Sequence, residues 1–131
     1  MIYSLLVMAS PASGTANTTA ARFAQALVQG GHRLERVFFY DAGVETGLSS
    51  RVVPQDEAEP LELWRELASA HGVELVVCVA SALRRGVLDA SEAQRHEKNL
   101  ATLDSAFCIG GLGLLIESAA TVDRLITFGP G

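Results

Sequence analysis

The sequence is poor in cysteine and has no excess of basic charge, and each shortage excludes a class of protein. Only two of its 131 residues are cysteines, and they lie far apart, so the chain has neither a disulfide framework nor the spacing of a structural zinc site. Ten Lys and Arg side chains against 15 Asp and Glu give a formal net charge of −5, which argues against direct, tight binding of nucleic acid. These counts favour a protein of a reducing compartment that binds neither metal nor nucleic acid directly.

The sequence also lacks a long hydrophobic run, because no stretch approaches the ~20 apolar residues of a transmembrane helix. No Lys or Arg precedes the apolar residues 2–9, so this run predicts a first strand and not a secretory signal. We therefore expect a cytoplasmic protein without membrane contact. Residues 1–131 fit one domain, which at this length buries roughly two thirds of its unfolded surface. With 49% hydrophobic and 19% charged residues, we expect other subunits to cover part of its apolar surface.

Apolar runs alternate with helix-period segments along the whole chain, which is typical of an α/β fold with a mainly parallel sheet. The predicted strands are residues 2–9, 34–40, 73–78, 107–109 and 124–128. The predicted helices are residues 18–29, 60–71, a short one that starts after Cys78 and stops at Gly86, one that starts at the capping box 89–92, and one through residues 115–120. Residues 41–59 are expected to form a long loop and residues 129–131 a loose tail.

Cys78 is the main candidate for chemistry, because it stands where an apolar strand ends and a short helix begins. The carboxyl end of a parallel strand faces the crevice in which open α/β sheets bind their ligands. The start of the helix, reinforced by Arg84 and Arg85, favours the thiolate, which is the form of cysteine that attacks. The alternative is an inert, buried cysteine that packs as a small hydrophobic side chain.

Cys78 and Arg84 also have the Cys-x5-Arg spacing of the anion-binding loop in tyrosine phosphatases and some arsenate reductases. That loop needs glycine so that its amides converge, whereas residues 79–83 are apolar, free of glycine and better suited to a helix. A phosphatase also needs an acid for the leaving group, and the sequence identifies none. This reading remains as a remote alternative.

The other candidates favour structural roles. Gly110–Gly113 precedes a helix and Ser10–Gly14 follows the first strand, but close packing and a surface turn explain these segments better than an anion site does. Cys108, between two apolar residues, is expected to be interior, with a resolving thiol as the alternative. Structural roles are expected for His32, His71 and His96. A solvated surface is expected for Asp56, Glu57 and Glu59.

The segment from Cys78 to Val87 reads Cys-Val-Ala-Ser-Ala-Leu-Arg-Arg-Gly-Val, and here the chain resembles the DsrE/TusD family of sulfur-relay proteins. The resemblance runs nearly end to end, and the order and spacing of several segments carry it together: Phe23–Leu27, Val37–Tyr40, Gly43-Val44, Trp64, His71–Val73, Asp89, Gly111–Gly113 and Asp123-Arg124. Ser81 departs from the family's pattern, since alanine is expected there. Its hydroxyl is expected either beside the sulfur or as a helix cap.

The resemblance implies a three-layer α/β/α sandwich whose five-stranded sheet has the order 4-3-2-1-5. It places the family's active cysteine on Cys78. Arg84 and Arg85 would then hold anionic sulfur species or an acidic partner surface, and the alternative is that they form a solvated helix end. It also implies a sulfurtransferase without cofactors, assembled with TusB-like and TusC-like subunits as a dimer of heterotrimers. A TusA-like protein would donate the sulfur and a TusE-like protein would accept it, for 2-thiouridine at the tRNA wobble position. The alternatives are a DsrE-like subunit of dissimilatory sulfur oxidation and a non-catalytic interaction subunit.

Overall fold

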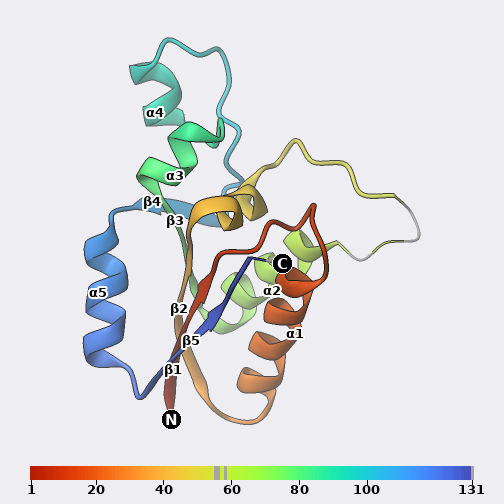
Figure 1. Cartoon of the computed structure of the whole chain (residues 1–131), viewed down its shortest axis with the longest axis vertical. Coiled ribbons are helices and arrows are strands. Elements are labelled where there is room, and N and C mark those ends of the chain that lie inside the picture. The colour runs from red at the N-terminus through yellow and green to blue at the C-terminus, as the bar shows by residue number, and fades with distance from the viewer. Residues whose placement is uncertain (55–56, 58, 131) are drawn as a thin grey trace.

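Residues 1–54, 57 and 59–130, which the computed structural model describes, form a five-stranded parallel sheet with helices on both faces (Figure 1). The strand order is β4-β3-β2-β1-β5, as the family resemblance implied. The strands are β1 (Ile2–Val7), β2 (Arg33–Phe39), β3 (Glu74–Cys78), β4 (Phe107–Gly110) and β5 (Arg124–Phe128). The helices are α1 (Ala16–Gln29), α2 (Pro60–His71), α3 (Val79–Arg84), α4 (Ala90–Arg95), α5 (Leu112–Thr121) and the 3-10 helix η1 (Asp41–Gly47).

Helices α1 and α2 cover one face of the sheet, and the main core lies beneath them. Trp64 of α2 is fully buried, and its ring meets that of Phe39 on β2 edge to face at 5.2 Å. Phe39 also contacts Phe107 of the edge strand β4, with ring centroids 5.4 Å apart. These aromatic contacts connect α2 with strands β2 and β4, and burial of such large side chains contributes much of the stabilisation.

Pro60 occupies the first turn of α2, as predicted. Glu59, expected only as solvated surface, instead caps the helix, because its side chain accepts a hydrogen bond from the Leu61 N–H at 3.0 Å. Gly72 ends the helix in the left-handed conformation, at φ 65°, which glycine adopts without steric cost. The chain therefore turns sharply into β3, and β3 carries Cys78 to its carboxyl end.

Helix α5 covers the opposite face, over a buried arginine. Arg36 on β2 donates from Nη1 to the Leu114 carbonyl (3.1 Å) and to Ser118 Oγ (2.9 Å), and from Nη2 to Glu74 of β3 (3.2 Å). The outer side of α5 stays apolar and open, because Leu112 is 48% exposed and Ile116 is 70% exposed.

The sequence predictions fail in two places. Residues 41–47 are not loop but the 3-10 helix η1, which buries Gly43, Val44, Thr46 and Gly47. Cys108 lies on the predicted strand but is exposed, because β4 is the edge of the sheet and its core-facing side chains are the alternate ones, Phe107 and Ile109. Four residues of the predicted loop and tail lie outside the described residues: Gln55, Asp56, Ala58 and Gly131.

Candidate functional site

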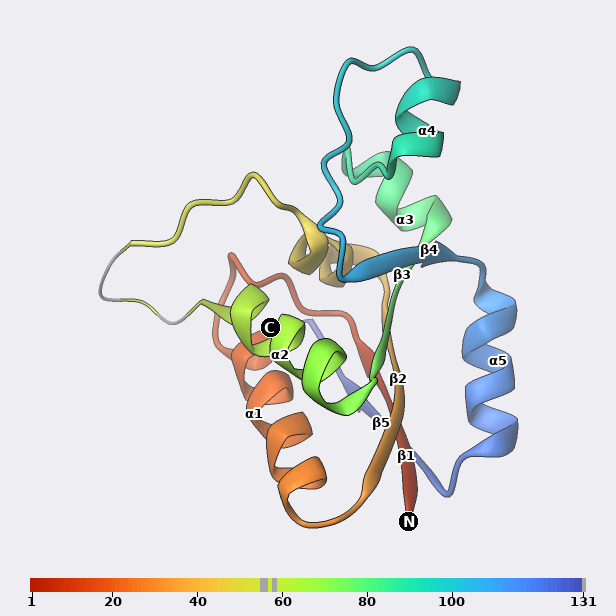
Figure 2. The same cartoon turned by 180° about the vertical axis from the view of Figure 1, so that it is seen from behind.

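Cys78 is both the last residue of β3 and the residue that precedes the first turn of α3. Its neighbour across the sheet is Gly110, at the end of β4. Figure 2 shows that α3 and α4 extend beyond this end of the sheet. The sequence prediction of a thiol at the carboxyl edge of a parallel strand is thus matched by the structure, at the edge where open α/β sheets bind ligands. The side chain itself is covered, since Cys78 is 2% exposed in the isolated chain.

The segment after Cys78 is helix α3, as its lack of glycine predicted. Residues 79–84 therefore do not form an open loop of converging amides, which the phosphatase alternative requires. The helix is short because the chain reverses at Gly86, whose φ of 72° is left-handed.

Arg85 does not face the thiol as a free cation; it pairs with two acids of η1. Its Nη2 lies 3.1 Å from Asp41 Oδ1 and its Nη1 lies 3.0 Å from Glu45 Oε2. Hydrogen bonds to Glu45, and then to Asp41, raise the pKa of the Arg85 guanidinium above its ordinary value. The guanidinium therefore ties the end of α3 to the segment that follows β2.

Ser81 makes a second tie between the same two elements. Its Oγ accepts a hydrogen bond from the Asp41 N–H at 3.0 Å, so it does not cap α3. Glu45 extends the contact to the β1–α1 loop, because its Oε1 accepts a hydrogen bond from Ser10 Oγ at 2.6 Å. One polar network, formed by Ser10, Asp41, Glu45, Ser81 and Arg85, therefore joins the segments that follow β1, β2 and β3. We call it the crevice network.

Two backbone features hold η1 in the crevice network. Asp41 has a φ of 51°, a left-handed conformation that aspartate tolerates better than most residues with a side chain. Gly43 packs so closely on the end of β1 that a Cβ there would lie 2.1 Å from the Val7 carbonyl oxygen. The sequence analysis missed Asp41 and Glu45. The signal available was an acid directly after a buried strand, at the same edge as Cys78.

Arg84 differs from its neighbour Arg85, because none of the ion pairs within residues 1–54, 57 and 59–130 includes it, although both residues are exposed. The structure therefore separates two arginines that the sequence treated alike. Arg85 is part of the crevice network, and Arg84 is an exposed side chain outside it.

Cys108 shares a sheet face with Glu74, because it lies opposite Val76 in the register and Glu74 is two residues earlier on β3. Burial, and then the Glu74 carboxylate, raise the pKa of the Cys108 thiol, while Arg36 lowers it. This exposed thiol is thus held in its neutral form, and it is not part of the crevice network.

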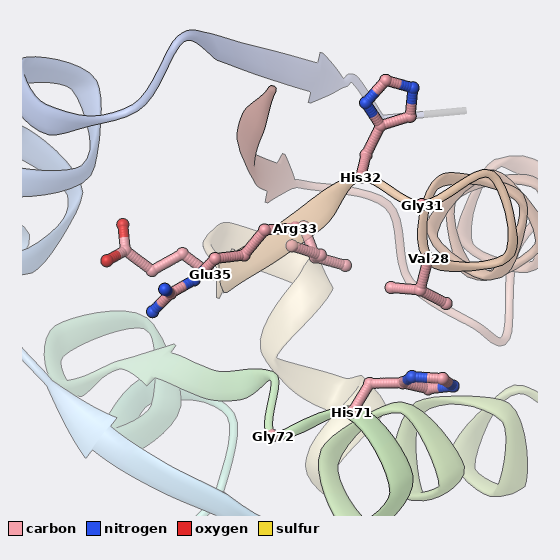
Figure 3. Close-up of a pocket in the computed structure, with 8 residues that line it drawn as sticks. Val28, Gly31, His32, Arg33, Glu35, His71 and Gly72 are labelled. Atoms are coloured by element: carbon pink, nitrogen blue, oxygen red, sulfur yellow. The ribbon is translucent and has the colours of Figure 1, made fainter.

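The histidines lie elsewhere. Figure 3 shows His32 and His71 in a pocket of about 360 Å³ beside the start of β2, and their rings do not converge on one point. This is the end of the sheet opposite Cys78, because β2 begins there. His96 pairs with Glu92 at 3.3 Å in α4, where Asp89 caps the helix as predicted. In the described part of the chain, no group of three His, Cys, Asp or Glu side chains lies close enough to hold a metal ion.

Gly110, considered above as part of an anion site, instead allows close packing. A Cβ there would lie 2.5 Å from Leu114 Cδ1 and 2.8 Å from Val76 Cγ1. The glycine therefore lets α5 approach the sheet beside Cys78, as the sequence analysis preferred.

Comparison with known proteins identifies the family. Residues 1–128 match the sequence model of the DsrE/DsrF-like family. The chain belongs to this family. A sulfurtransferase TusD of Serratia proteamaculans is 46% identical over 124 residues, which cover 94% of this chain and 96% of the relative. A sulfurtransferase TusD homolog of Pseudomonas aeruginosa is 42% identical over 124 residues, 95% of each chain.

A putative sulfurtransferase DsrE of Allochromatium vinosum is 40% identical over 129 residues, covering 98% of this chain and 99% of the relative. The enzyme class predicted from the sequence, sulfurtransferase, is therefore that of these family members. The crystal structure of the ychN protein from E. coli has the same fold, with a TM-score of 0.77 and 21% identity over 98% of this chain and all of that one. None of the helices in residues 1–54, 57 and 59–130 has the length and apolar character needed to cross a membrane.

Proposed function

We propose that this chain is a sulfurtransferase subunit that carries a sulfane sulfur as a persulfide on Cys78 and passes it to a thiol of an acceptor protein. The observation that carries the proposal is the place of Cys78 at the carboxyl edge of β3, in a chain similar over its full length to named sulfurtransferases. The other cysteine, Cys108, lies in the middle of an edge strand, where a raised pKa makes it a poor nucleophile.

The reaction is an exchange between sulfur atoms that needs no metal or organic cofactor. The Cys78 thiolate attacks the outer sulfur of a donor persulfide, a new S–S bond forms, and the donor leaves as its thiolate. An acceptor thiolate then attacks the outer sulfur on Cys78, and Cys78 leaves as a thiolate again. Each step exchanges one S–S bond for another, so no external oxidant or reductant is consumed.

We propose a cytoplasmic relay in which a TusA-like protein is the donor and a TusE-like protein the acceptor, leading to 2-thiouridine at the tRNA wobble position. TusB-like and TusC-like subunits would complete a dimer of heterotrimers. The exposed apolar side chains of Leu112 and Ile116 on α5 support burial against other subunits. The net charge of −5 supports a role that does not bind tRNA directly, and exposed Arg84 is suited to an acidic partner surface.

The test is to load the chain with sulfur from a persulfide donor and to measure intact mass. The parent chain and Cys108→Ser should each gain one sulfur atom that a reductant removes, and Cys78→Ser should gain none. Cys108→Ser is the matched control, because it removes the other thiol and leaves Cys78 in place. Loading of Cys78→Ser at the level of the parent chain would overturn the assignment.

A second function has specific support, because the DsrE relative covers as much of the chain as the TusD relatives do. In that case the chain serves dissimilatory sulfur oxidation. Expression in a cell that lacks its own TusD separates the two pathways. Restored thiolation of the wobble uridine supports the tRNA pathway, whereas a folded, sulfur-loaded chain that restores none supports sulfur oxidation.

A non-catalytic interaction subunit is supported by the 2% exposure of Cys78. A scaffold needs no accessible sulfur, whereas a relay needs the sulfur to meet a visiting thiol. Alkylation of Cys78 in the complete assembly separates the two. Labelling of the native assembly supports the relay, and labelling only after denaturation supports the scaffold.

A further inference from the structure

The proposed relay leaves a physical problem, because the sulfur of Cys78 is covered while a persulfide exchange requires contact with a second protein. Cys78 is 2% exposed, and α3 begins at the next residue. A six-residue helix has little intrinsic stability of its own, since isolated helices shorter than ~12 residues are marginal in water. What keeps α3 in place must therefore be its contacts with the rest of the chain.

The polar contacts of α3 converge on η1. Ser81 accepts a hydrogen bond from the Asp41 N–H near the middle of the helix, and Arg85 pairs with Asp41 and Glu45 directly after its end. Asp41 takes part in both ties, and it does so from a left-handed backbone conformation. Sparsely populated backbone conformations of this kind persist only where the surroundings hold them, and they cluster at binding sites and switches.

The ion pairs between Arg85 and η1 are weak enough to break while the domain stays folded. The two acids and Arg85 are partly exposed, with side-chain exposures of 55%, 26% and 35%. Ion pairs this open to water are weak, so breaking them shifts an equilibrium without unfolding the domain. The acids belong to η1, whose Gly43 is packed on β1, so η1 is the fixed side of these contacts.

We propose that Asp41 and Glu45, acting through Arg85, are positioning residues that hold α3, which begins directly after Cys78, in its observed place and thereby control access of a visiting thiol to the Cys78 sulfur. The role of this closure in sulfur transfer rests on the proposed function, whereas the closure itself can be measured in the isolated chain. The natural trigger would be a partner that offers Arg85 a competing carboxylate as it docks. Arg85 would then pair with the carboxylate of the docking protein instead of Asp41 and Glu45, and α3 would be released.

The test is the rate at which iodoacetamide alkylates Cys78 in the folded chain, followed by peptide mass. Arg85→Gln should raise this rate about three- to tenfold, because two exposed ion pairs are lost and about 1.4 kcal/mol corresponds to a factor of ten. Iodoacetamide is uncharged, so the substitution does not change its attraction to the site. A faster reaction of Arg85→Gln at the same pH therefore reports access.

Arg84→Gln is the matched control, because it removes the same charge one residue away from a side chain without an ion pair in the described structure. It should leave the rate within twofold of the parent, and Arg85→Lys should restore most of the closure. Asp41→Asn combined with Glu45→Gln should match Arg85→Gln, and adding Arg85→Gln to that pair should change nothing further. Added salt should speed the parent but not Arg85→Gln, because it screens the exposed ion pairs.

An Arg85→Gln rate equal to that of Arg84→Gln, with no salt effect in the parent, would overturn the proposal. Cys108, which is exposed in the same molecules, should react at one rate throughout and serves as the reference for reagent reactivity, while an unchanged Tm excludes general loosening of the fold. Failure of the proposed function is a separate result: Cys78→Ser would then load sulfur like the parent, whatever Arg85→Gln does to alkylation.

Discussion

Replacement of Asp104 by asparagine should destabilise the chain more than any other exchange of a carboxylate for an amide at its ion pairs. Asp104 lies in the segment between α4 and β4, and its side chain is 4% exposed. It accepts hydrogen bonds from Arg65 through Nε (3.0 Å) and Nη2, and from the Ala106 N–H (3.0 Å). It therefore fastens the segment that leads into β4 to helix α2.

The magnitude follows from these contacts. Asparagine keeps an acceptor for Ala106 but loses the charge that faces Arg65, and hydrogen bonds to charged groups contribute about 1.5–3 kcal/mol each. Because Arg65 is 44% exposed and regains water, we expect a loss of about 1.5–3 kcal/mol for the pair together. With an unfolding entropy of about 2.1 cal/mol/K per residue, this corresponds to a Tm lower by roughly 5–11 °C.

The pH dependence gives an independent check. Hydrogen bonds from Arg65 hold the pKa of Asp104 below its ordinary value of 3.8, although burial opposes them. A carboxyl whose pKa is lowered on folding contributes stability that is complete above its unfolded pKa and is lost as the pH falls through its folded pKa. The difference in Tm between the parent and Asp104→Asn should therefore be constant at neutral and mildly acidic pH and should shrink below pH 3.8.

Calorimetry or circular dichroism melting of the isolated chain measures both effects. Glu62→Gln is the matched control, because Glu62 also pairs with Arg65 but is 64% exposed, and its loss should cost less than about 0.5 kcal/mol. Equal Tm values for the two variants, or a difference that grows on acidification, would refute this account of Asp104.

Three further predictions concern packing and the second thiol. Gly43→Ala should lower the free energy of unfolding in urea by about 1–3 kcal/mol, because its Cβ has no room beside β1. Gly113→Ala is the control, because open space surrounds that position and the substitution should not destabilise the chain; similar losses for both variants would contradict the packing argument. Trp64→Ala should cost about 3–5 kcal/mol by the same measurement, since the ring is fully buried, and a loss below about 1 kcal/mol would show that the site collapses around the vacancy. Glu74→Gln should lower the pKa of the Cys108 thiol, because it removes the carboxylate that raises it, and the pH profile of Cys108 alkylation should move to lower pH; an unmoved profile would contradict that assignment.

The apolar surface of α5 fits the expectation that the chain works in an assembly. The helix was predicted from its spacing of apolar residues, but that pattern did not say which of them face the sheet. In the structure Ser118 is buried against Arg36, while Ile116 is 70% exposed. The inner face of α5 therefore carries a polar side chain because it bonds the buried arginine. Its outer face carries an apolar side chain in water, which is expected of a surface that another subunit covers.

The sequence by itself determined the order of the elements, the parallel sheet and the position of Cys78. These follow from local chemistry: continuous apolar runs form central strands, Pro60 and Gly72 bound α2, and a glycine-free segment after Cys78 forms a helix. The strand order followed from the family resemblance. Each of these depends on residues that are neighbours in the chain, or on a pattern shared along its whole length.

Only the tertiary structure decided the exposure of the two cysteines and the roles of the two adjacent arginines. Cys108 is open because β4 is an edge strand, and Cys78 is covered although it is the last residue of its strand. Arg85 pairs with η1, which reaches the end of α3 from about 40 residues earlier in the sequence, whereas Arg84 has no ion pair among the residues that the structure describes. Such contacts depend on where distant segments meet in space, and no local propensity encodes that meeting.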